Sequence, residues 1–239
     1  MLNQVLDILF PQEKCALCRK PGKYYSKLPW CQECLDRMLE LQCSGSTCQK
    51  CGKYLPGELG LCADCRQNPP PFEISRAVGP YEEQYRLATK VLKFMGKKYL
   101  AQQMGAMMEA KIESESKFGP IDLIVPVPIA PNSLQVRGFN QTALLAKQIG
   151  KQLGIKVDCG AIVRVKDTPR QTELSREERE KNLLQAFAVK GDIQLAGKSV
   201  LLVDDVYTTG STARECTRVL LAAGAQRVCI ITWATGRGF

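Results

Sequence analysis

The sequence predicts an α/β protein in which a small cysteine-rich N-terminal part precedes a larger domain built on a parallel β-sheet. Two observations lead to this prediction. Four C-x-x-C pairs lie within the first 65 residues. Beyond residue 72, apolar runs of strand length alternate with segments of helical periodicity. Such alternation is typical of a parallel sheet with helices on both faces.

The four C-x-x-C pairs have the spacing of zinc ligands. They form two sets, Cys15, Cys18, Cys31 and Cys34, then Cys48, Cys51, Cys62 and Cys65. Each pair places two thiolates on one tight turn, and two facing turns give tetrahedral sulfur ligation of Zn²⁺. The chain has no histidine, so any zinc ligation there would be by cysteine alone. We therefore expect tandem zinc ribbons of the four-cysteine type, with two structural Zn²⁺ sites that are closed to water.

A disulfide framework in a secreted protein is the alternative for these cysteines. Residues 1–10 lack the basic start and long apolar core of a signal peptide, and their leucines fall at helical spacing. Zinc in a reducing compartment is therefore favoured, together with a short N-terminal helix. The other cysteines lack partners at ligand spacing and are expected to be buried thiols: Cys43, Cys159, Cys216 and Cys229.

Composition fits two unequal parts. A chain of 239 residues with 45% hydrophobic content is long enough for one ordinary domain plus a metal-stabilised one. The formal charge of +9 falls to about +5 when eight thiolates bind two zinc ions, which still favours polyanionic partners. No apolar run of membrane-spanning length is present. The proline run at residues 69–71 predicts a ribbon domain over 1–68, a linker over 69–72 and a second domain over 73–239.

The elements of the second domain follow from periodicity and from breakers. Two helices are expected over residues 81–95 and 99–116, with Gly96 as the stop between them. The pattern then runs strand, helix, strand, strand, helix, strand over residues 121–127, 139–153, 161–165, 200–203, 213–223 and 227–233.

A paired carboxylate and a hydroxyl-rich loop follow the apolar strand predicted at residues 200–203. Asp204 and Asp205 come at its carboxyl end, just where ligands of open α/β sheets bind. The following residues offer hydroxyl donors, one glycine for close backbone approach and the N–H groups of a helix start: Tyr207, Thr208, Thr209, Gly210, Ser211 and Thr212. Donors for an anion beside acceptors for hydroxyls fit a ribose 5-phosphate.

The alternative for this segment is a capped helix with solvated acids, but two acids and four hydroxyls around one glycine exceed what capping requires. The sequence has no G-x-x-x-x-G-K-[ST] and no G-x-G-x-x-G, which disfavours P-loop enzymes and dinucleotide-binding folds.

A second polar loop precedes the helix expected at residues 139–153. Arg137 supplies a cation for an anionic ligand, Gly138 allows close backbone approach, and Asn140 and Gln141 add amides. A solvated Arg137 and a helix-capping Asn140 are the alternative. Further on, residues 164–182 carry six basic and five acidic side chains, which suggests either a mobile lid or a solvated charged loop.

Residues 200–212 resemble the phosphoribosyl pyrophosphate (PRPP) motif of type I phosphoribosyltransferases. The resemblance implies that Asp204 and Asp205 hold the ribose hydroxyls and act at the reacting carbon, and that residues 208–212 grip the 5-phosphate. It also implies that the loop at Arg137 and Gly138 holds the pyrophosphate, with Mg²⁺ bound alongside PRPP.

The chain as a whole resembles the ComF family of bacterial competence proteins, which includes the GntX branch. The resemblance rests on the C-x-x-C pairs, on residues 137–141, on residues 204–210, and on Gln171, Leu174, Ser175, Arg179 and Asn182. It implies a double zinc ribbon before a type I phosphoribosyltransferase-like domain. It further implies a cytoplasmic role in natural transformation, handling single-stranded DNA beside a helicase-like partner, with no established phosphoribosyl acceptor.

Three function classes stay open: a phosphoribosyltransferase with an unidentified acceptor, a PRPP or nucleotide sensor, and a nucleic-acid adaptor. PRPP binding coupled to DNA handling is favoured. For the adaptor, Arg86, Lys90, Lys93 and Lys97 share a face if the first helix continues through Gly96, although a charged stripe is usually only a solvated face. Nearby, Tyr85 and Tyr99 are expected to be exposed for base stacking, and Phe94 is not.

Overall fold

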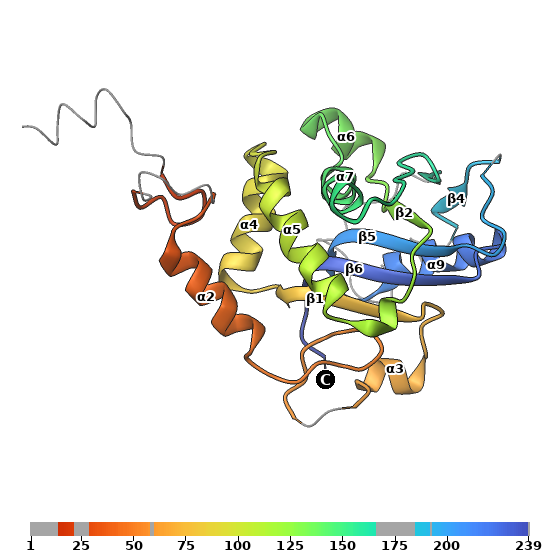
Figure 1. Ribbon diagram of the computed structural model, residues 1–239, viewed down its shortest axis with the longest axis horizontal. Helices are drawn as coiled ribbons and strands as arrows, with labels where there is room; N and C mark the ends of the chain where they lie inside the picture. The colour runs from red at the N-terminus through yellow and green to blue at the C-terminus, as the bar shows by residue number, and fades with distance from the viewer. Residues whose placement is uncertain (1–13, 22–28, 58–59, 166–184, 192, 239) are drawn as a thin grey trace, which may run out of the picture.

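The computed structural model of the protein describes residues 14–21, 29–57, 60–165, 185–191 and 193–238 (Figure 1). The helix expected at residues 1–10 lies outside the described residues. So does most of the charged segment at 164–182, including the part with Gln171, Ser175 and Arg179.

Four parallel strands form the central sheet in the order β1-β6-β5-β2. Their bounds are β1 (Ile74–Pro80), β6 (Arg227–Thr235), β5 (Ser199–Tyr207) and β2 (Leu123–Pro126). The parallel sheet is as predicted, but β1 was not expected, because Ser75 and Arg76 interrupt its apolar residues. Arg76 is buried there because its Nε donates to Glu115 Oε2 at 2.7 Å.

The strand expected at residues 161–165 exists but does not join the parallel sheet. As β3 (Ile162–Arg164) it pairs antiparallel with β4 (Phe187–Val189) in a separate two-stranded sheet. The expectation that it continues the parallel series was therefore wrong. A short apolar run identifies a strand without identifying its partner, and here Val163 is exposed, unlike residues of a strand covered on both faces.

Helices cover both faces of the central sheet, as predicted (Figure 1). One face carries α4 (Glu83–Phe94), α5 (Leu100–Glu113) and α7 (Gln141–Leu153), and the other carries α9 (Ser211–Ala222). The shorter helices are α2 (Gln32–Gln42), α3 (Ala63–Gln67), η1 (Ser116–Phe118) and α6 (Pro131–Arg137). None of the helices in the described ranges is long and apolar enough to cross a membrane.

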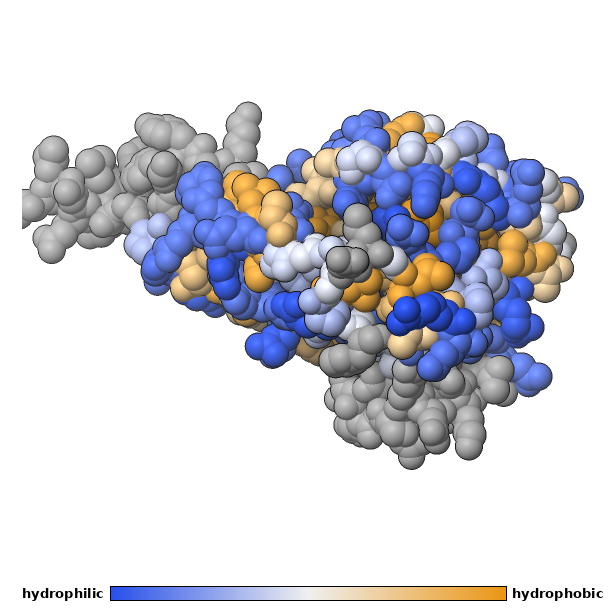
Figure 2. Space-filling view, turned by 90° about the horizontal axis from the view of Figure 1, so that it is seen from below, coloured by the Kyte–Doolittle hydropathy of each residue, from blue (hydrophilic) through white to orange (hydrophobic). Residues whose placement is uncertain are grey.

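The two cysteine sets pack on opposite sides of the sheet. Cys15 and Cys34 of the first set share a buried cluster with α2, α4 and α5, in which the Trp30 and Trp233 rings lie 6.3 Å apart. The second set shares the other cluster with α9 and with Phe72. Seen from the side of α3, hydrophobic residues form separate areas among hydrophilic ones (Figure 2). The buried apolar side chains around each set therefore belong to the clusters that pack against the sheet.

The four remaining cysteines divide into two kinds. Cys216 and Cys229 are buried, as predicted, in α9 and β6. Cys43 and Cys159 are exposed, so the expectation of burial was wrong for these two. Both lie outside the regular elements: Cys43 is the C-cap of α2, and Cys159 stands in the turn before β3.

Candidate functional site

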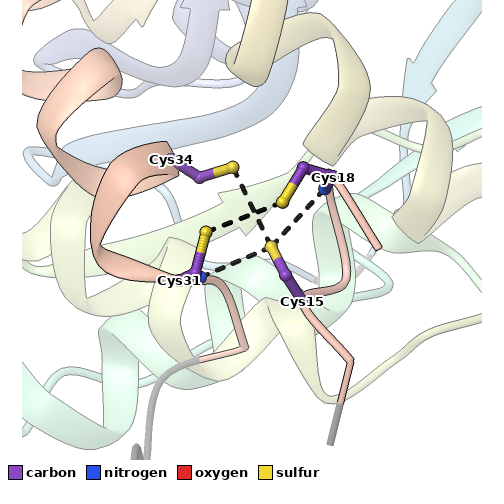
Figure 3. A group of neighbouring side chains, drawn as sticks. All are labelled: Cys15, Cys18, Cys31 and Cys34. Atoms are coloured by element: carbon purple, nitrogen blue, oxygen red, sulfur yellow. Dashed lines mark hydrogen bonds between the residues drawn. The ribbon is translucent and has the colours of Figure 1, made fainter. Parts of the chain in front are cut away.

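The eight cysteines of the C-x-x-C pairs form two sulfur clusters, each with all its Sγ atoms within 4.8 Å of one another. In the first, Cys18 and Cys31 Sγ lie 3.6 Å apart, and Cys15 and Cys34 Sγ 3.9 Å (Figure 3). Four sulfurs each about 2.3 Å from one zinc ion would be about 3.8 Å apart in a tetrahedron. The clusters therefore fit Zn²⁺ as they stand.

Backbone N–H groups support the sulfurs. The amides of Cys18 and Cys31 point to Cys15 Sγ at 3.5 and 3.3 Å, and the amide of Cys62 points to Cys48 Sγ at 3.3 Å. Such donors stabilise thiolates, the form that binds metal. The two sets are zinc-binding four-cysteine sites of the structural kind, as predicted.

The paired acids belong to β5 itself. The strand was expected to end at residue 203, but it continues to Tyr207, since backbone pairing with β6 persists through Thr235. Neighbouring residues of a strand point to opposite faces of the sheet. Accordingly, Asp205 is directed toward α4 and α7. On the face of α9, burial and next the charge of Asp204 raise the pKa of the Cys216 thiol.

Asp205 is the centre of a polar network between three elements. Its Oδ2 accepts a hydrogen bond from Gln141 Nε2 at 2.8 Å and lies 2.5 Å from Lys93 Nζ. Gln141 Oε1 in turn accepts from the guanidinium of Arg137. One carboxylate thus holds a lysine directly and an arginine through an amide, at the end of the strand.

Asp204 has a different environment. Its Oδ1 accepts the backbone N–H of Asp205 at 2.8 Å. Removal from water, and next the charge of Asp205, raise the pKa of Asp204 to about 8. Near neutral pH this carboxyl therefore holds a proton readily unless a cation or hydroxyl donors approach it.

The loop after β5 leads directly into α9. Gly210 is the N-cap residue, with φ +84°, and a Cβ there would lie 2.3 Å from the Tyr207 hydroxyl. Tyr207 is buried beneath the loop, where its ring meets Phe72 edge-on at 6.2 Å. The hydroxyls of Thr209 and Ser211 lie 2.8 Å apart. The loop thus places hydroxyl groups beside the N–H groups at the start of α9, as expected, and the buried Tyr207 ring packs beneath it.

The second polar loop contributes the side chains of Arg137 and Gln141 to the same cavity. Arg137 ends α6, and Gly138 follows in the left-handed conformation with φ +73°. Asn140 caps α7, since its Oδ1 accepts from Thr142 N at 3.1 Å, while its Nδ2 donates to Val127 O. Capping, the alternative for Asn140, is therefore its observed role.

A cavity of about 1340 Å³ joins both loops to the acid pair. The predicted site residues that line it are Arg137, Asp204, Asp205, Tyr207, Thr208, Thr209, Gly210, Ser211 and Thr212. Gly138 and Asn140 are not among its lining residues. Gln141, expected as an amide of the second polar loop, also lines the cavity, whereas Lys93 and Phe94 were not predicted to do so. No local pattern around Lys93 or Phe94 indicated that they line this cavity.

The four basic residues expected to share one face of the first helix do not form a continuous stripe. Helix α4 ends at Phe94 and Gly96 has φ +63°, so Lys97 is not on its face, and Lys93 turns into the site. Arg86 and Lys90 are exposed. The expectation for the aromatic residues was wrong in two cases: Tyr85 is fully buried, and Phe94 is exposed. Tyr99 is exposed, as expected.

Comparison with known proteins agrees with this architecture. Residues 5–66 match the double zinc ribbon domain and residues 140–238 the phosphoribosyl transferase domain. DNA utilization protein YhgH of Salmonella typhi is 35% identical over 219 residues, which cover 90% of this chain and 93% of that protein. Competence protein F of Haemophilus influenzae is 27% identical, covering 94% and 96%. The chain belongs to the ComF family.

More distant similarities were also found for this ComF protein. Competence protein ComFC of Bacillus subtilis is 24% identical over 81% of this chain and 78% of that protein. Among solved structures, adenine phosphoribosyltransferase from Thermoanaerobacter pseudethanolicus has a TM-score of 0.39 and 14% identity, covering 59% of this chain and 83% of that one. The parallel sheet and the domain match give this ComF protein a phosphoribosyltransferase-type fold behind its zinc ribbons.

Proposed function

We propose that this ComF-family protein binds PRPP, or a related sugar phosphate, at the carboxyl edge of its sheet. The observation that supports the proposal is the cavity that joins the loop before α9, the acid pair and Arg137. Residues 208–212 and the N–H groups of α9 would bind the 5-phosphate. Asp204 and Asp205 would accept hydrogen bonds from the ribose hydroxyls, and Arg137 and Lys93 would face the diphosphate.

The acid pair also fits Mg²⁺, which prefers oxygen ligands and is commonly bound by one or two carboxylates with substrate phosphates. Asp204 and Asp205 both line the cavity and would hold the ion near the diphosphate. When bound with PRPP, Mg²⁺ would neutralise part of the diphosphate charge.

Calorimetric titration with PRPP and Mg²⁺ tests the proposal. Asp204→Asn/Asp205→Asn should weaken binding by about 1.5–3 kcal/mol for each charge-assisted hydrogen bond to a ribose hydroxyl that the change removes. Asp36→Asn/Glu40→Gln removes two exposed carboxylates from α2 and serves as the charge-matched control, expected to bind like the parent. A folded Asp204/Asp205 double variant that binds PRPP as tightly as the parent would refute the proposal.

A DNA-handling role is the second part of the proposal. It is supported by the names of the relatives, DNA utilization and competence proteins, and by the positive charge of the chain. In this proposal the protein acts in the cytoplasm during natural transformation, contacting single-stranded DNA beside a helicase-like partner. Titrating PRPP with and without single-stranded DNA tests the connection, because linked sites change each other's affinity by the same factor. A PRPP affinity that changes when single-stranded DNA is present would show that the two binding events are coupled. An unchanged affinity would show that they are independent.

Phosphoribosyl transfer is the alternative that the domain match favours. Asp204 and Asp205 would then stabilise the positive charge that develops on the ribose carbon as pyrophosphate leaves. Release of pyrophosphate from PRPP, measured with candidate acceptors, distinguishes this alternative from a protein that only binds PRPP.

A further inference from the structure

The second cysteine set packs on the same face of the sheet as α9 and the loop that begins it. We call this loop, residues 208–212, the phosphate loop. The buried cluster on that face contains all four cysteines of the second set together with Phe72, Tyr207 and Ala213. Cys15 and Cys34 of the first set belong to the cluster on the other face. Two sites with the same ligands thus differ in their position relative to the phosphate loop.

Tyr207 is the side chain between the second set and the phosphate loop. It is buried, and a Cβ on Gly210 would lie only 2.3 Å from its hydroxyl. Its ring meets Phe72 edge-on at 6.2 Å, within the cluster that holds the second set. Burial, and next the charges of Cys51 and Cys65, raise the pKa of the Tyr207 hydroxyl. The side chain therefore supports the loop at one end and lies close to the second set at the other.

The main chain makes a second connection. At the end of β5, Tyr207 O accepts a hydrogen bond from Gly236 N at 2.9 Å. Two residues later, Gly238 N donates to Tyr54 O in the second ribbon at 2.7 Å. A Cβ on Gly238 would lie 3.2 Å from the Cβ of Cys62. The segment that leaves β6 toward the ribbon around α3 (Figure 1) is therefore fixed to the strand before the phosphate loop and to the second set.

A third connection joins α9 to α3. Arg214 lies in the first turn of α9, and its guanidinium donates to Asn68 O and, at 3.3 Å, to Pro69 O. Asn68 is the C-cap of α3, the helix that carries Cys65. The helix whose N–H groups would bind the phosphate is thus held to the helix that supplies one of the sulfurs.

We infer that the second zinc site positions the phosphate loop, with Tyr207 as the positioning residue, so that zinc binding there and sugar-phosphate binding strengthen each other. The inference rests on the proposed function. Zinc binding fixes the conformation of the turns that hold the ion, and the three connections carry this constraint to the loop and to α9. Two coupled sites change each other's affinity by the same factor, usually about 5- to 150-fold. The three connections reach the second set and not the first, whose zinc ion should therefore be uncoupled from the sugar phosphate.

Competition with a zinc chelator, with and without saturating ribose 5-phosphate, tests the inference. In the parent protein, ribose 5-phosphate should raise the affinity for one of the two zinc ions about 5- to 150-fold and leave the other unchanged. Cys18→Ser, which keeps the second set intact, should show the whole effect, and Cys51→Ser, which keeps the first set intact, should show none. The two variants are matched, because each loses one thiol ligand and any zinc bound by free sugar phosphate affects both equally.

The role of Tyr207 is tested in the Cys18→Ser background. Tyr207→Leu removes the ring and should reduce the factor by which ribose 5-phosphate raises the zinc affinity. Tyr207→Phe retains the ring and should keep the factor. At saturating ligand, a direct contact between Tyr207 and the sugar phosphate cancels from this ratio, so the measurement reports positioning alone. Zinc content and circular dichroism establish that each variant is folded, and the comparison of Cys18→Ser with Cys51→Ser does not depend on the Tyr207 variants.

The possible results separate the inference from the proposed function. If the parent binds ribose 5-phosphate but neither zinc ion, or both, are held more tightly, the inference is overturned and the sugar-phosphate site remains. Equal effects in Cys18→Ser and Cys51→Ser also overturn it. An undiminished factor in a folded Tyr207→Leu variant overturns the role of Tyr207. If neither ribose 5-phosphate nor PRPP binds the parent, the proposed function itself fails, and the inference fails with it.

Discussion

The Lys93 ammonium lies 2.5 Å from the Asp205 carboxylate, which joins the last turn of α4 to the end of β5. The Lys93 side chain is 20% exposed and that of Asp205 7%. Because both groups are largely removed from water, their attraction is screened less than that of a surface pair. A ligand whose hydroxyl groups donate hydrogen bonds to Asp205 has to share this carboxylate with Lys93.

Replacing Lys93 with Met should lower the free energy of unfolding by about 1–3 kcal/mol, because the partly buried Asp205 loses its directly paired cation and keeps the hydrogen bond from Gln141, with Arg137 beyond that amide. Lys90→Met, an exposed change on the same helix, should alter stability by less than about 0.5 kcal/mol. Denaturant unfolding measures both. Adding Asp205→Asn to Lys93→Met should restore part of the stability. Simple addition of the two single effects would show that the pair contributes no coupling.

The zinc sites predict a metal content of about two ions per chain for protein prepared reduced and without chelator. Cys51→Ser should reduce the content to about one, because it removes a ligand of the second set. Cys159→Ser changes an exposed thiol that belongs to neither set and should keep both ions. Metal analysis of the three proteins checks this. Finding no zinc in the parent would contradict the assignment of both sites.

Local patterns in the sequence predicted the parts of the site that depend on neighbours along the chain. Each of these motifs is contained in a short stretch of sequence: the apolar run before Asp204 and Asp205, the hydroxyls that follow them, and the C-x-x-C turns. The sheet class and most helices of the second domain follow from periodicity in the same way.

Contacts between distant segments could not be predicted. The charge periodicity of α4 gives no sign that Lys93 faces Asp205, 112 positions later, rather than solvent alongside Lys90. Aromatic residues on the same helix were assigned to the wrong environments for the same reason. Tyr85 is buried because its ring lies 5.0 Å from that of Trp233, and nothing local to Tyr85 indicates that partner.

The raised pKa of Asp204 predicts a pH dependence of stability. The carboxyl titrates near pH 4 in the unfolded chain and near pH 8 in the folded protein, so the folded state holds an extra proton between these values. Its contribution to stability is complete below about pH 4 and is lost as the pH rises to about 8.

Asp204→Asn should remove this pH dependence. From pH 6 to pH 8 the parent should lose stability relative to the variant by at most about 1.4 kcal/mol per pH unit. Denaturant unfolding at pH 6, 7, 8 and 9 measures the difference, from which the titration of groups common to both proteins cancels. A constant difference across this range would mean that Asp204 is already ionised at pH 6.

The last prediction concerns single-stranded DNA. Arg86 and Lys90 are exposed cations of α4 and are available for the proposed DNA-handling role, whereas Lys93 pairs with Asp205 in the cavity. Each phosphate contact releases counterions, so the logarithm of affinity falls with the logarithm of salt concentration by about 0.7 per contact on single strands. If both residues contact phosphates, Arg86→Gln/Lys90→Gln should reduce this slope by about 1.4 while PRPP affinity stays unchanged.

Fluorescence anisotropy of a labelled oligonucleotide over a salt series measures the slope. Lys151→Gln/Lys156→Gln, an equal reduction of charge around the end of α7, is the control and should leave it unaltered. An unchanged slope in the Arg86/Lys90 variant would show that these two cations are only solvated, and any DNA contact would then have to be made by another surface.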